Sequence, residues 1–336
     1  MNVTKNSRIV QVFSKAFTNP QGQMTETFKE DYKKSIAFIK ELAQDIKNPQ
    51  NQYVLNQIMT NVIDNLIRFN TNYLDIIGDV QRTGYGESPR FKYRTQEVEA
   101  FWQATASTAD ASRVGFAYES LKTETLSAIP VAEWIEIADG RYDFELLIQD
   151  VMNQFDIKIA QKIQSTLYAA MNGMPSPNFA AGNGLNQPAF DELLNAMMRF
   201  GGGCAIVGDF EALQKLPGLT GIGGNVSDSV IDEFNRNGLI GTYKGAKVVK
   251  LVNPYVGLNG FETALNRGYI YIIPNVSREM KTLKLWFRGG IDSMFEQNFD
   301  DKSYRMRFDQ LFGAGVVGVD KIRQPIAIYE DLSLSQ

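Results

Sequence analysis

The segment DFELLIQDVMNQFDIKIAQKIQSTLYAAMNG, residues 143–173, has the clearest helical pattern in the 336-residue sequence. Asp143 is placed to cap the first turn of this helix, and Gly173 and Pro175 are placed to end it. At 1.5 Å per residue the helix would be about 45 Å long, so we expect it to span the width of a domain. Apolar residues at every third or fourth position form the stripe that it would bury: Phe144, Ile148, Val151, Phe155, Ile159, Ile163, Leu167 and Ala170.

A long polar segment, residues 78–127, precedes this helix. It contains the alternation Arg90-Phe91-Lys92-Tyr93-Arg94, which is typical of a strand whose two faces differ. We therefore expect a two-stranded excursion here, followed by a short strand at 128–138. Because an isolated two-stranded ribbon is only marginally stable in water, we expect a surface outside the monomer to cover it.

The first 77 residues contain two kinds of sequence. Residues 1–23 are polar and mixed, with Pro20 and Gly22 near their end, which indicates an extended or poorly ordered arm. From Thr25 onward, apolar residues at helical spacing predict two amphipathic helices, separated by NPQN at 48–51. Each of these helices has one apolar stripe to bury.

The remainder of the chain alternates between helix and strand and then returns to strands. The order of elements between 186 and 262 predicts a compact α/β unit. From residue 267 strand patterns follow, including the hairpin SMFEQNFDDKSYRMRFDQLF at 293–312, and the chain closes on QPIAIYED. Aromatic residues alternate with charged ones in the hairpin, so we expect one buried face and one solvent-exposed face. The solvent-exposed face is suited to contact a partner.

The composition excludes several classes of site. The chain has no histidine and a single cysteine, which excludes histidine-based nucleophile systems, most zinc sites and an intrachain disulfide. Its net charge of −4 and isoelectric point near 5.2 argue against a protein that coats phosphate backbones. No apolar run is long enough to cross a membrane, and the first residues lack the pattern of a signal peptide. We expect a globular protein of cytoplasmic origin.

Residues that could carry chemistry are few. Cys204 opens an apolar strand, and we interpret it as a core residue. The glycine-rich GLTGIGGN at 218–225 matches neither nucleotide-binding pattern and is interpreted as a flexible connection. Asp209 with Glu211, or Glu119 with Glu124, could serve as the acid and nucleophile of a glycosidase, but we favour helix capping and solvated strands. We assign no catalytic residue, cofactor or metal ligand.

The order of these elements resembles that of the major capsid proteins of tailed bacteriophages, which share the Hong Kong 97 (HK97) fold. The likeness is carried by AIPVAEWIEIADGRYDFELLIQDVMNQFDIKIAQKI at 128–163 and FEQNFDDKSYRMRFDQLFGAGVVGVDKIRQPIAIYED at 295–331. It implies an α+β fold with an N-terminal arm, an extended β-hairpin loop, a peripheral domain with a long spine helix, and an axial α/β domain. The ranges implied are 1–77 for the N-terminal arm and helices, 78–127 for the extended loop, 128–185 and 263–323 for the peripheral domain, 186–262 for the axial domain, and 324–336 for the last strand and tail. The last strand is expected to rejoin the axial domain.

The resemblance also implies a function. The protein would be a structural major capsid protein rather than an enzyme, forming pentamers and hexamers of an icosahedral shell around double-stranded DNA that it holds without sequence-specific binding. The implied partners are further copies of the chain and scaffolding, portal and decoration proteins, with no membrane, and assembly would take place in the host bacterial cytoplasm. A cellular encapsulin nanocompartment is the first alternative, and a carboxylate-dependent enzyme in 186–262 is the second. Charged residues are expected at contacts between subunits: Arg90, Lys92, Arg94, Asp300, Asp301, Lys302 and Arg305.

Overall fold

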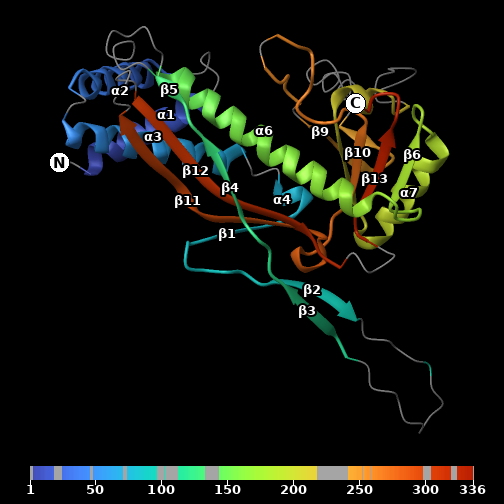
Figure 1. Cartoon of the computed structure of the whole chain (residues 1–336). Coiled ribbons are helices and arrows are strands. Elements are labelled where there is room, and N and C mark those ends of the chain that lie inside the picture. Colours follow the sequence, from blue (N-terminus) through green and yellow to red (C-terminus); the bar gives the residue numbers. More distant parts are fainter. Residues whose placement is uncertain are drawn as a thin grey trace.

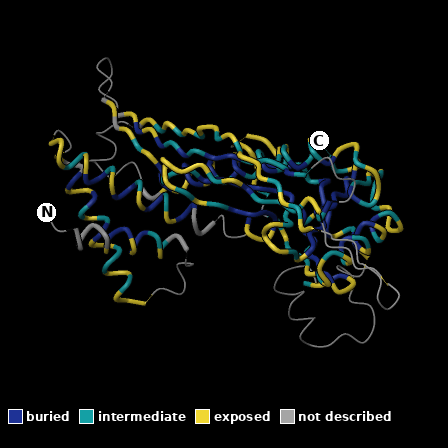
Figure 2. Tube along the Cα trace, turned by 90° about the horizontal axis from the view of Figure 1, so that it is seen from below, coloured by how far each residue is buried: buried dark blue, intermediate teal, exposed yellow. Residues whose placement is uncertain are grey.

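The computed structural model describes most of the chain. The described residues are 3–18, 25–45, 48–70, 74–96, 102, 113–132, 144–217, 241–251, 253–257, 259–297, 304–318 and 324–335. The molecule is elongated, with the N-terminal helices at one end, a compact mixed unit at the other and a ribbon projecting from the side (Figure 1). Figure 2 shows that buried residues form a band along its length.

The first sheet has five strands and combines distant parts of the chain. Its order is β1 (Asp79–Thr83), β11 (Leu283–Gln297), β12 (Tyr304–Val316) and β4 (Glu124–Ala128), and β5 (Val131–Ala132) also pairs with β12. β1 runs parallel to β11, whereas β11, β12, β4 and β5 pair in antiparallel fashion. The predicted hairpin is therefore the centre of this sheet, and the predicted excursion begins and ends on either side of it.

Two glycines of β12 are explained by the close approach of the chain that enters β4. A Cβ atom at Gly313 would lie 2.6 Å from the carbonyl oxygen of Lys122. A Cβ atom at Gly315 would lie 2.4 Å from the side chain of Leu121. Any larger residue at Gly313 would push the backbone of residues 121–123 away from the sheet.

Helices cover one face of this sheet. α6 (Phe144–Met171) runs from the N-terminal helices to the second unit, as Figure 1 shows, and its length confirms the predicted spine helix. Its buried side chains Ile148, Phe155, Ile159 and Ile163 share one core with α3 (Pro49–Asn70), β11 and β12. Asp143, the expected cap of α6, lies outside the described residues.

The N-terminal arm is helical, which corrects the prediction of an extended or poorly ordered segment. α1 (Val3–Thr18) buries Ile9, Val10 and Phe13 against α2 (Glu26–Gln44) and α3. This apolar face repeats at helical spacing, but the polar residues around it and Pro20 obscured the pattern. The NPQN sequence begins α3 at Pro49, since proline is well tolerated in the first turn of a helix. The short helix α4 (Leu74–Ile77) follows α3 and leads into β1.

The second sheet has six strands in the order β6 (Phe179–Gly182), β13 (Ala327–Asp331), β10 (Tyr269–Pro274), β7 (Cys204–Gly208), β9 (Ala246–Lys250) and β8 (Thr242–Tyr243). The helices α7 (Gln187–Gly201) and α8 (Phe210–Gln214) pack on one face, and α6 packs on the other. Alternate residues of β10 therefore enter different cores: Tyr271 faces α6, whereas Ile270 and Ile272 face α7 and α8. Burial on both sides accounts for the continuous apolar run in β10.

The strand pairing differs in one respect from the ranges expected from the sequence. β10 lies within the range 263–323 and β6 within 128–185, but both pair in the sheet that contains β7 and β9. β13 joins the same sheet, between β6 and β10. The last strand thus rejoins this unit as expected, whereas β6 and β10 join it from outside the range 186–262.

The ribbon consists of β2 (Phe91–Gln96) and β3 (Gly115–Glu119), which pair with each other and with no other strand that the structure describes. In antiparallel register Lys92 lies opposite Tyr118 and Arg94 lies opposite Phe116. The two-stranded excursion is confirmed, although the ends of the range 78–127 belong to the five-stranded sheet. Figure 1 shows the ribbon extending away from both sheets.

Candidate assembly surfaces

A charged cluster holds the turn that connects the two sheets. This turn, residues 277–282, includes the short 3-10 helix η3 (Arg278–Met280) and lies between β10 and β11. Lys284 is fully buried, and its Nζ lies 3.2 Å from Asp79 Oδ2 and donates to the carbonyl oxygen of Arg278 at 2.8 Å. Arg278 Nε is 3.5 Å from Asp79 Oδ1. Burial lowers the pKa of the Lys284 ammonium, while the Asp79 carboxylate opposes that effect.

The same turn holds the base of the ribbon. Lys92 Nζ of β2 lies 3.2 Å from Glu279 Oε1 of η3. The same ammonium lies 3.7 Å from the ring centroid of Phe116 on β3, which is within the range of a cation–π contact. Lys92 therefore has partners within its own chain, and one of its roles is to fix the direction in which the ribbon leaves the body.

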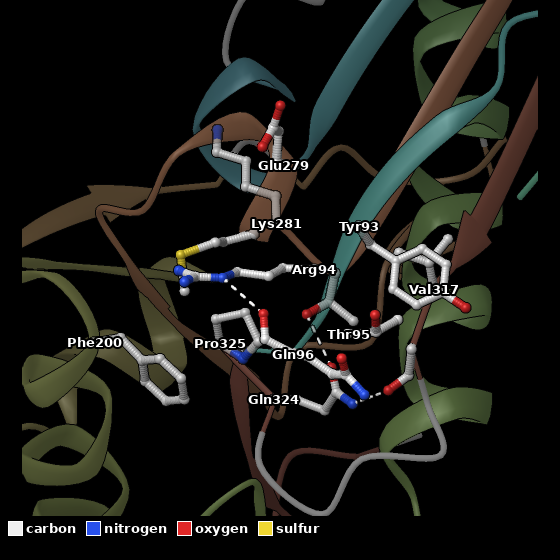
Figure 3. Close-up of a pocket in the computed structure, with 13 residues that line it drawn as sticks. Tyr93, Arg94, Thr95, Gln96, Phe200, Glu279, Lys281, Val317, Gln324 and Pro325 are labelled. Carbon is white, nitrogen blue, oxygen red and sulfur yellow. Dashed lines mark hydrogen bonds between the residues drawn. The ribbon is translucent and has the colours of Figure 1, made fainter. Parts of the chain in front are cut away.

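A cavity of about 350 Å³ separates the ribbon base from the six-stranded unit (Figure 3). Tyr93 and Arg94 of β2 line one side, and Phe200 of α7 and Pro325 line the other. Its polar groups bond to one another, since Arg94 Nε donates to the Gln96 carbonyl oxygen at 3.3 Å. Glu279 is the only carboxylate among the residues described at its wall, so the cavity does not bring together the acid pair that a glycosidase needs.

The exposed face of the ribbon carries apolar side chains. Phe116 and Tyr118 alternate along β3, and Val114 continues the same face. All three are exposed, and Tyr118 is 62% exposed. Arg90, just before β2, is also exposed, whereas Arg94 is half-buried beside the cavity. This face combines aromatic rings with cations, and its apolar side chains remain exposed although Lys92 contacts the Phe116 ring.

The hairpin of β11 and β12 has the two faces that its sequence predicts. Met306 and Phe308 are buried, whereas Arg305 and Arg307 between them are exposed. Arg307 Nε lies 2.9 Å from both carboxylate oxygens of Asp309. Arg305 lies opposite Glu296 of β11 and Val131 of β5. Asp300, Asp301 and Lys302 lie outside the described residues, so the expected contacts at the tip remain predictions.

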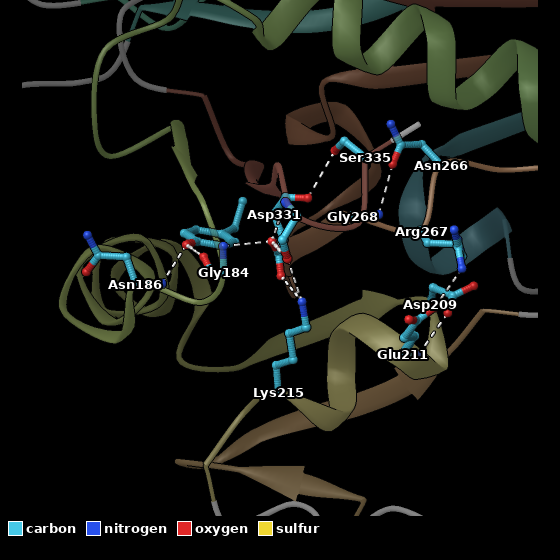
Figure 4. A network of polar contacts seen from close by, with 12 residues as sticks. Gly184, Asn186, Asp209, Glu211, Lys215, Asn266, Arg267, Gly268, Asp331 and Ser335 are labelled. Atoms are coloured by element: carbon cyan, nitrogen blue, oxygen red, sulfur yellow. Dashed lines mark hydrogen bonds and ion pairs between the residues drawn. The ribbon is translucent and has the colours of Figure 1, made fainter.

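A polar network ties β13 to the unit around it (Figure 4). The buried carboxylate of Asp331 accepts hydrogen bonds from Lys215 Nζ at 2.7 Å and from the backbone amide of Gly184 at 2.9 Å. Tyr329 Oη accepts from the amide of Asn186 at 2.6 Å and donates to the carbonyl oxygen of Gly184 at 2.7 Å. These bonds join β13, α8 and the entry to α7.

The carboxylates considered as an active site have structural partners. Asp209 caps α8 by accepting from the amide of Glu211 at 2.9 Å, and its other oxygen accepts from Asn253 Nδ2 at 2.8 Å. Glu211 pairs with Arg267 at 3.0 Å, as Figure 4 shows. Glu124 pairs with Lys162 at 2.9 Å. The interpretation of Asp209 as a helix cap is confirmed.

The remaining candidates for chemistry are also structural. Cys204 is buried, and desolvation raises the pKa of its thiol to about 11, which disfavours the reactive thiolate. Among the described residues, no group of three or more His, Cys, Asp or Glu side chains is arranged to hold a metal ion. Within the same residues, no helix is long and apolar enough to span a membrane.

Comparison with protein families identifies this architecture. Residues 2–322 match the family described as "SPbeta prophage-derived putative capsid protein YonB". The chain belongs to the YonB capsid family. The match includes the helices, the ribbon and nearly all of both sheets. No curated protein matches the sequence.

Of three solved structures compared with the chain, the first aligns with a TM-score above 0.5 and agrees with the YonB assignment at the level of the fold. A chain from Microbacterium phage Oxtober96 aligns with a TM-score of 0.52 at 15% identity, covering 77% of this chain and 90% of that chain. The head structure of Helicobacter pylori bacteriophage KHP40 aligns at 0.49 with 11% identity, covering 77% and 90%. A virus-like particle from Pyrococcus furiosus aligns at 0.48 with 14% identity, covering 80% and 98%.

The YonB family and the first of these alignments together confirm the HK97-like capsid fold. The chain is a structural major capsid protein of a tailed phage, and its place is in the virion capsid. As a capsid subunit it forms a homo-oligomeric shell. We therefore look for contacts between copies on two surfaces, the exposed ribbon and the solvent-exposed face of the hairpin.

Sequence reasoning missed the charged cluster beneath the ribbon. Lys284 stands in LKLWF at 283–287, where a lysine between apolar residues suggests an exposed position in an alternating strand. It is buried because β1 lies beside β11 and supplies Asp79 in register with it. The Asp79 carboxylate in GDVQ at 78–81 was the one local sign of a buried ion pair. Its partner, Lys284, lies on a strand far away in the sequence, so the pairing could not be predicted.

Proposed function

We propose that copies of this chain assemble as pentamers and hexamers of an icosahedral head that encloses double-stranded DNA without reading its sequence. The observation that carries this proposal is the ribbon, which exposes aromatic side chains and pairs with no other strand among the described residues. Two strands alone are marginal in water. A neighbouring copy in the shell would supply the missing cover.

The proposed contacts lie on two surfaces. On the ribbon, Arg90, Lys92 and Arg94 would set the partner and register, because rim charges select a partner more than they add affinity. Lys92 would act through its own-chain contact with Glu279, which orients the ribbon. At the hairpin, the contact residues would be Asp300, Asp301, Lys302 and Arg305.

We propose domain ranges that are based on strand pairing. The extended loop would be the part of 78–127 between β1 and β4, and the peripheral domain would comprise α6 and the five-stranded sheet. The axial domain would be the six-stranded unit, so it would include β6, β10 and β13 in addition to 186–262. The long hydrogen-bonded hairpin of β11 and β12 supports placing 283–316 in the peripheral domain.

We further propose that the protein has no enzymatic role. The capping and ion-pairing functions of Asp209, Glu211 and Glu124 support this assignment. Scaffolding, portal and decoration proteins would be its partners during assembly in the host bacterial cytoplasm. The prophage family favours a phage head over an encapsulin-like compartment.

Removing the exposed aromatic face of the ribbon tests the proposal. Phe116 and Tyr118 lie on that face of β3, so combining Phe116→Ser with Tyr118→Ser removes the face and leaves both strands in place. We expect this variant to keep the circular dichroism spectrum and melting temperature of the unmodified chain and to lose closed shells in negative-stain microscopy. Normal shells from this variant would contradict the role given to the ribbon.

The contents of the particles distinguish a phage head from an encapsulin-like nanocompartment. Heads recovered from induced host cells should hold nuclease-protected double-stranded DNA. Particles that instead hold a single host enzyme and no DNA would favour the nanocompartment. A chain that never forms particles, alone or with the products of its neighbouring genes, would contradict both the phage head and the nanocompartment.

A further inference from the structure

A second aromatic surface lies on the segment between β9 and β10. This aromatic loop (residues 254–257 and 259–263) exposes Tyr255 by 60% and Phe261 by 87%. The two rings meet edge to face, with centroids 5.8 Å apart. Rings held in this way form a pre-shaped apolar knob, which is typical of an anchor at a protein interface.

The aromatic loop is held at its base. The Val256 amide donates to the Glu262 carbonyl oxygen at 2.7 Å, and the Ala264 amide donates to the Pro254 carbonyl oxygen at 2.8 Å. The side chain of Asn253 bonds to both the amide and the carbonyl oxygen of Leu265, at 2.8 and 3.0 Å. The knob is therefore ordered before any partner arrives, so binding would cost little conformational entropy.

The position of the aromatic loop relates it to the ribbon. Figure 1 shows the segment between β9 and β10 projecting from one edge of the molecule, while the ribbon projects from the opposite edge, with α6 between them. In a ring of copies related by rotation, one edge of each copy faces the opposite edge of the next, which is a heterologous contact. The two surfaces would then meet between neighbours although they cannot meet within one chain.

We propose that the aromatic loop of each subunit receives the ribbon of a neighbouring copy, an inference that rests on the proposed shell. Tyr255 and Phe261 pack against the exposed face of β3 that carries Phe116 and Tyr118. The exposed carboxylate of Glu262 lies beside the rings, and the ribbon base carries Arg90, Lys92 and Arg94. The contact therefore joins apolar surfaces and opposite charges, which favours this pairing over contact between two ribbons.

Cross-linking tests this contact directly. One chain carries Phe261→Cys and a second carries Tyr118→Cys, so only a contact between copies joins the two introduced thiols. The chains are assembled together and treated with a short bis-maleimide, and dimers are measured on a denaturing gel. Cys204 gives little background because it is buried, and the unmodified chain measures that background. Tyr53→Cys replaces Phe261→Cys in the matched control, since Tyr53 is an exposed aromatic residue on α3, 67% exposed.

We expect dimers from the 261–118 pair and a loss of that signal with the 53–118 pair. Shells that form normally but give no 261–118 dimer, or give equal dimer in the control, would overturn the inference and leave the proposed function intact. If the unmodified chain forms no shells, the result contradicts both this inference and the proposed function.

A second variant covers the case in which a cysteine at the loop prevents assembly. The double variant Tyr255→Ser and Phe261→Ser should melt at the same temperature as the unmodified chain and lose shells, whereas Tyr53→Ser keeps them. Normal shells from the double variant would count against the contact.

Discussion

Lys284 and Asp79 form an ion pair that is buried beneath the ribbon. Removing the carboxylate should destabilise the fold more than removing the ammonium, because Arg278 remains near Asp79 whereas Lys284 forms no second ion pair among the described residues. We expect Asp79→Asn to cost about 3 kcal/mol, as the loss of one buried partner usually does. Lys284→Met should cost about 1 kcal/mol, since the apolar chain still fills its space. Urea denaturation measures the free energy of unfolding that each variant loses. Equal losses in the two variants would contradict the prediction.

Asp331 gives stability a dependence on pH. Burial raises the pKa of its carboxyl group, but hydrogen bonds from Lys215, Ser333 and the Gly184 amide outweigh burial, so the pKa is lowered. A carboxyl group whose pKa is lowered on folding stabilises the protein above its unfolded pKa of about 3.9 and loses that stabilisation as the pH falls through its folded pKa. Asp331→Asn should therefore cost about 2 kcal/mol near neutral pH and much less in strong acid.

Thermal melts of both proteins across the acid range check this prediction. The control is Asp150→Asn on the exposed face of α6, whose melting temperature should follow the unmodified protein at every pH. A constant gap between Asp331→Asn and the unmodified protein would show that the charge of Asp331 does not stabilise the fold.

At the scale of elements, α6 links the two units, and its faces tolerate different changes. Ile159 is 1% exposed in the shared core, so Ile159→Asp should cost several kcal/mol, roughly 4, and leave little folded protein. Gln161 donates to the Ala264 carbonyl oxygen at 2.9 Å, so Gln161→Ala should cost about 1 kcal/mol. Gln154→Ala, on the exposed face, is the control and should change stability by less than about 0.5 kcal/mol. Chemical denaturation measures all three, and a different ranking would contradict this register.

Elements with a local signal could be predicted from the sequence, and their partners could not. The stripe of α6, the alternation of β12 and the ribbon depend on residues close together in the chain. The helix α1 was missed because its apolar face is short and lies among polar residues. The membership of β10 in the six-stranded sheet depends on β7 and β13, which are far away in the sequence, and the apolar run of β10 fits any buried position.

The candidate assembly surfaces show the same difference between local patterns, which could be predicted, and distant contacts, which could not. The alternation of charged and aromatic residues marked the ribbon and the hairpin as exposed surfaces, and Met306 and Phe308 confirm the covered face. The contact of Lys92 with Glu279 and the aromatic loop were not foreseen, since both depend on turns whose shape is set by side chains such as Asn253. A short loop containing Tyr255 and Phe261 has no periodicity from which to predict exposure.

At the scale of the whole molecule, the hairpin tip should affect assembly without affecting the fold. Reversing Asp300 and Asp301 to Lys should change monomer stability by less than about 0.5 kcal/mol, as surface substitutions usually do. The same reversal should abolish or misdirect shells, because each contact recurs at every symmetry-related position. A thermal melt and negative-stain microscopy measure the two effects, with Arg305→Gln as a milder change nearby. Normal shells from the double reversal would show that the tip is merely solvated.

The position of β13 determines when the molecule can become complete. β13 lies between the edge strand β6 and β10, so the six-stranded sheet has a gap beside that edge strand until residues 327–331 leave the ribosome. The five-stranded sheet likewise waits for β12 before β4 has a partner. Because these pairings join residues far apart in the chain, folding should be slow and should follow synthesis. A chain that lacks β13 leaves β6 without its partner strand, so we expect a growing shell to incorporate only subunits in which the six-stranded sheet is complete.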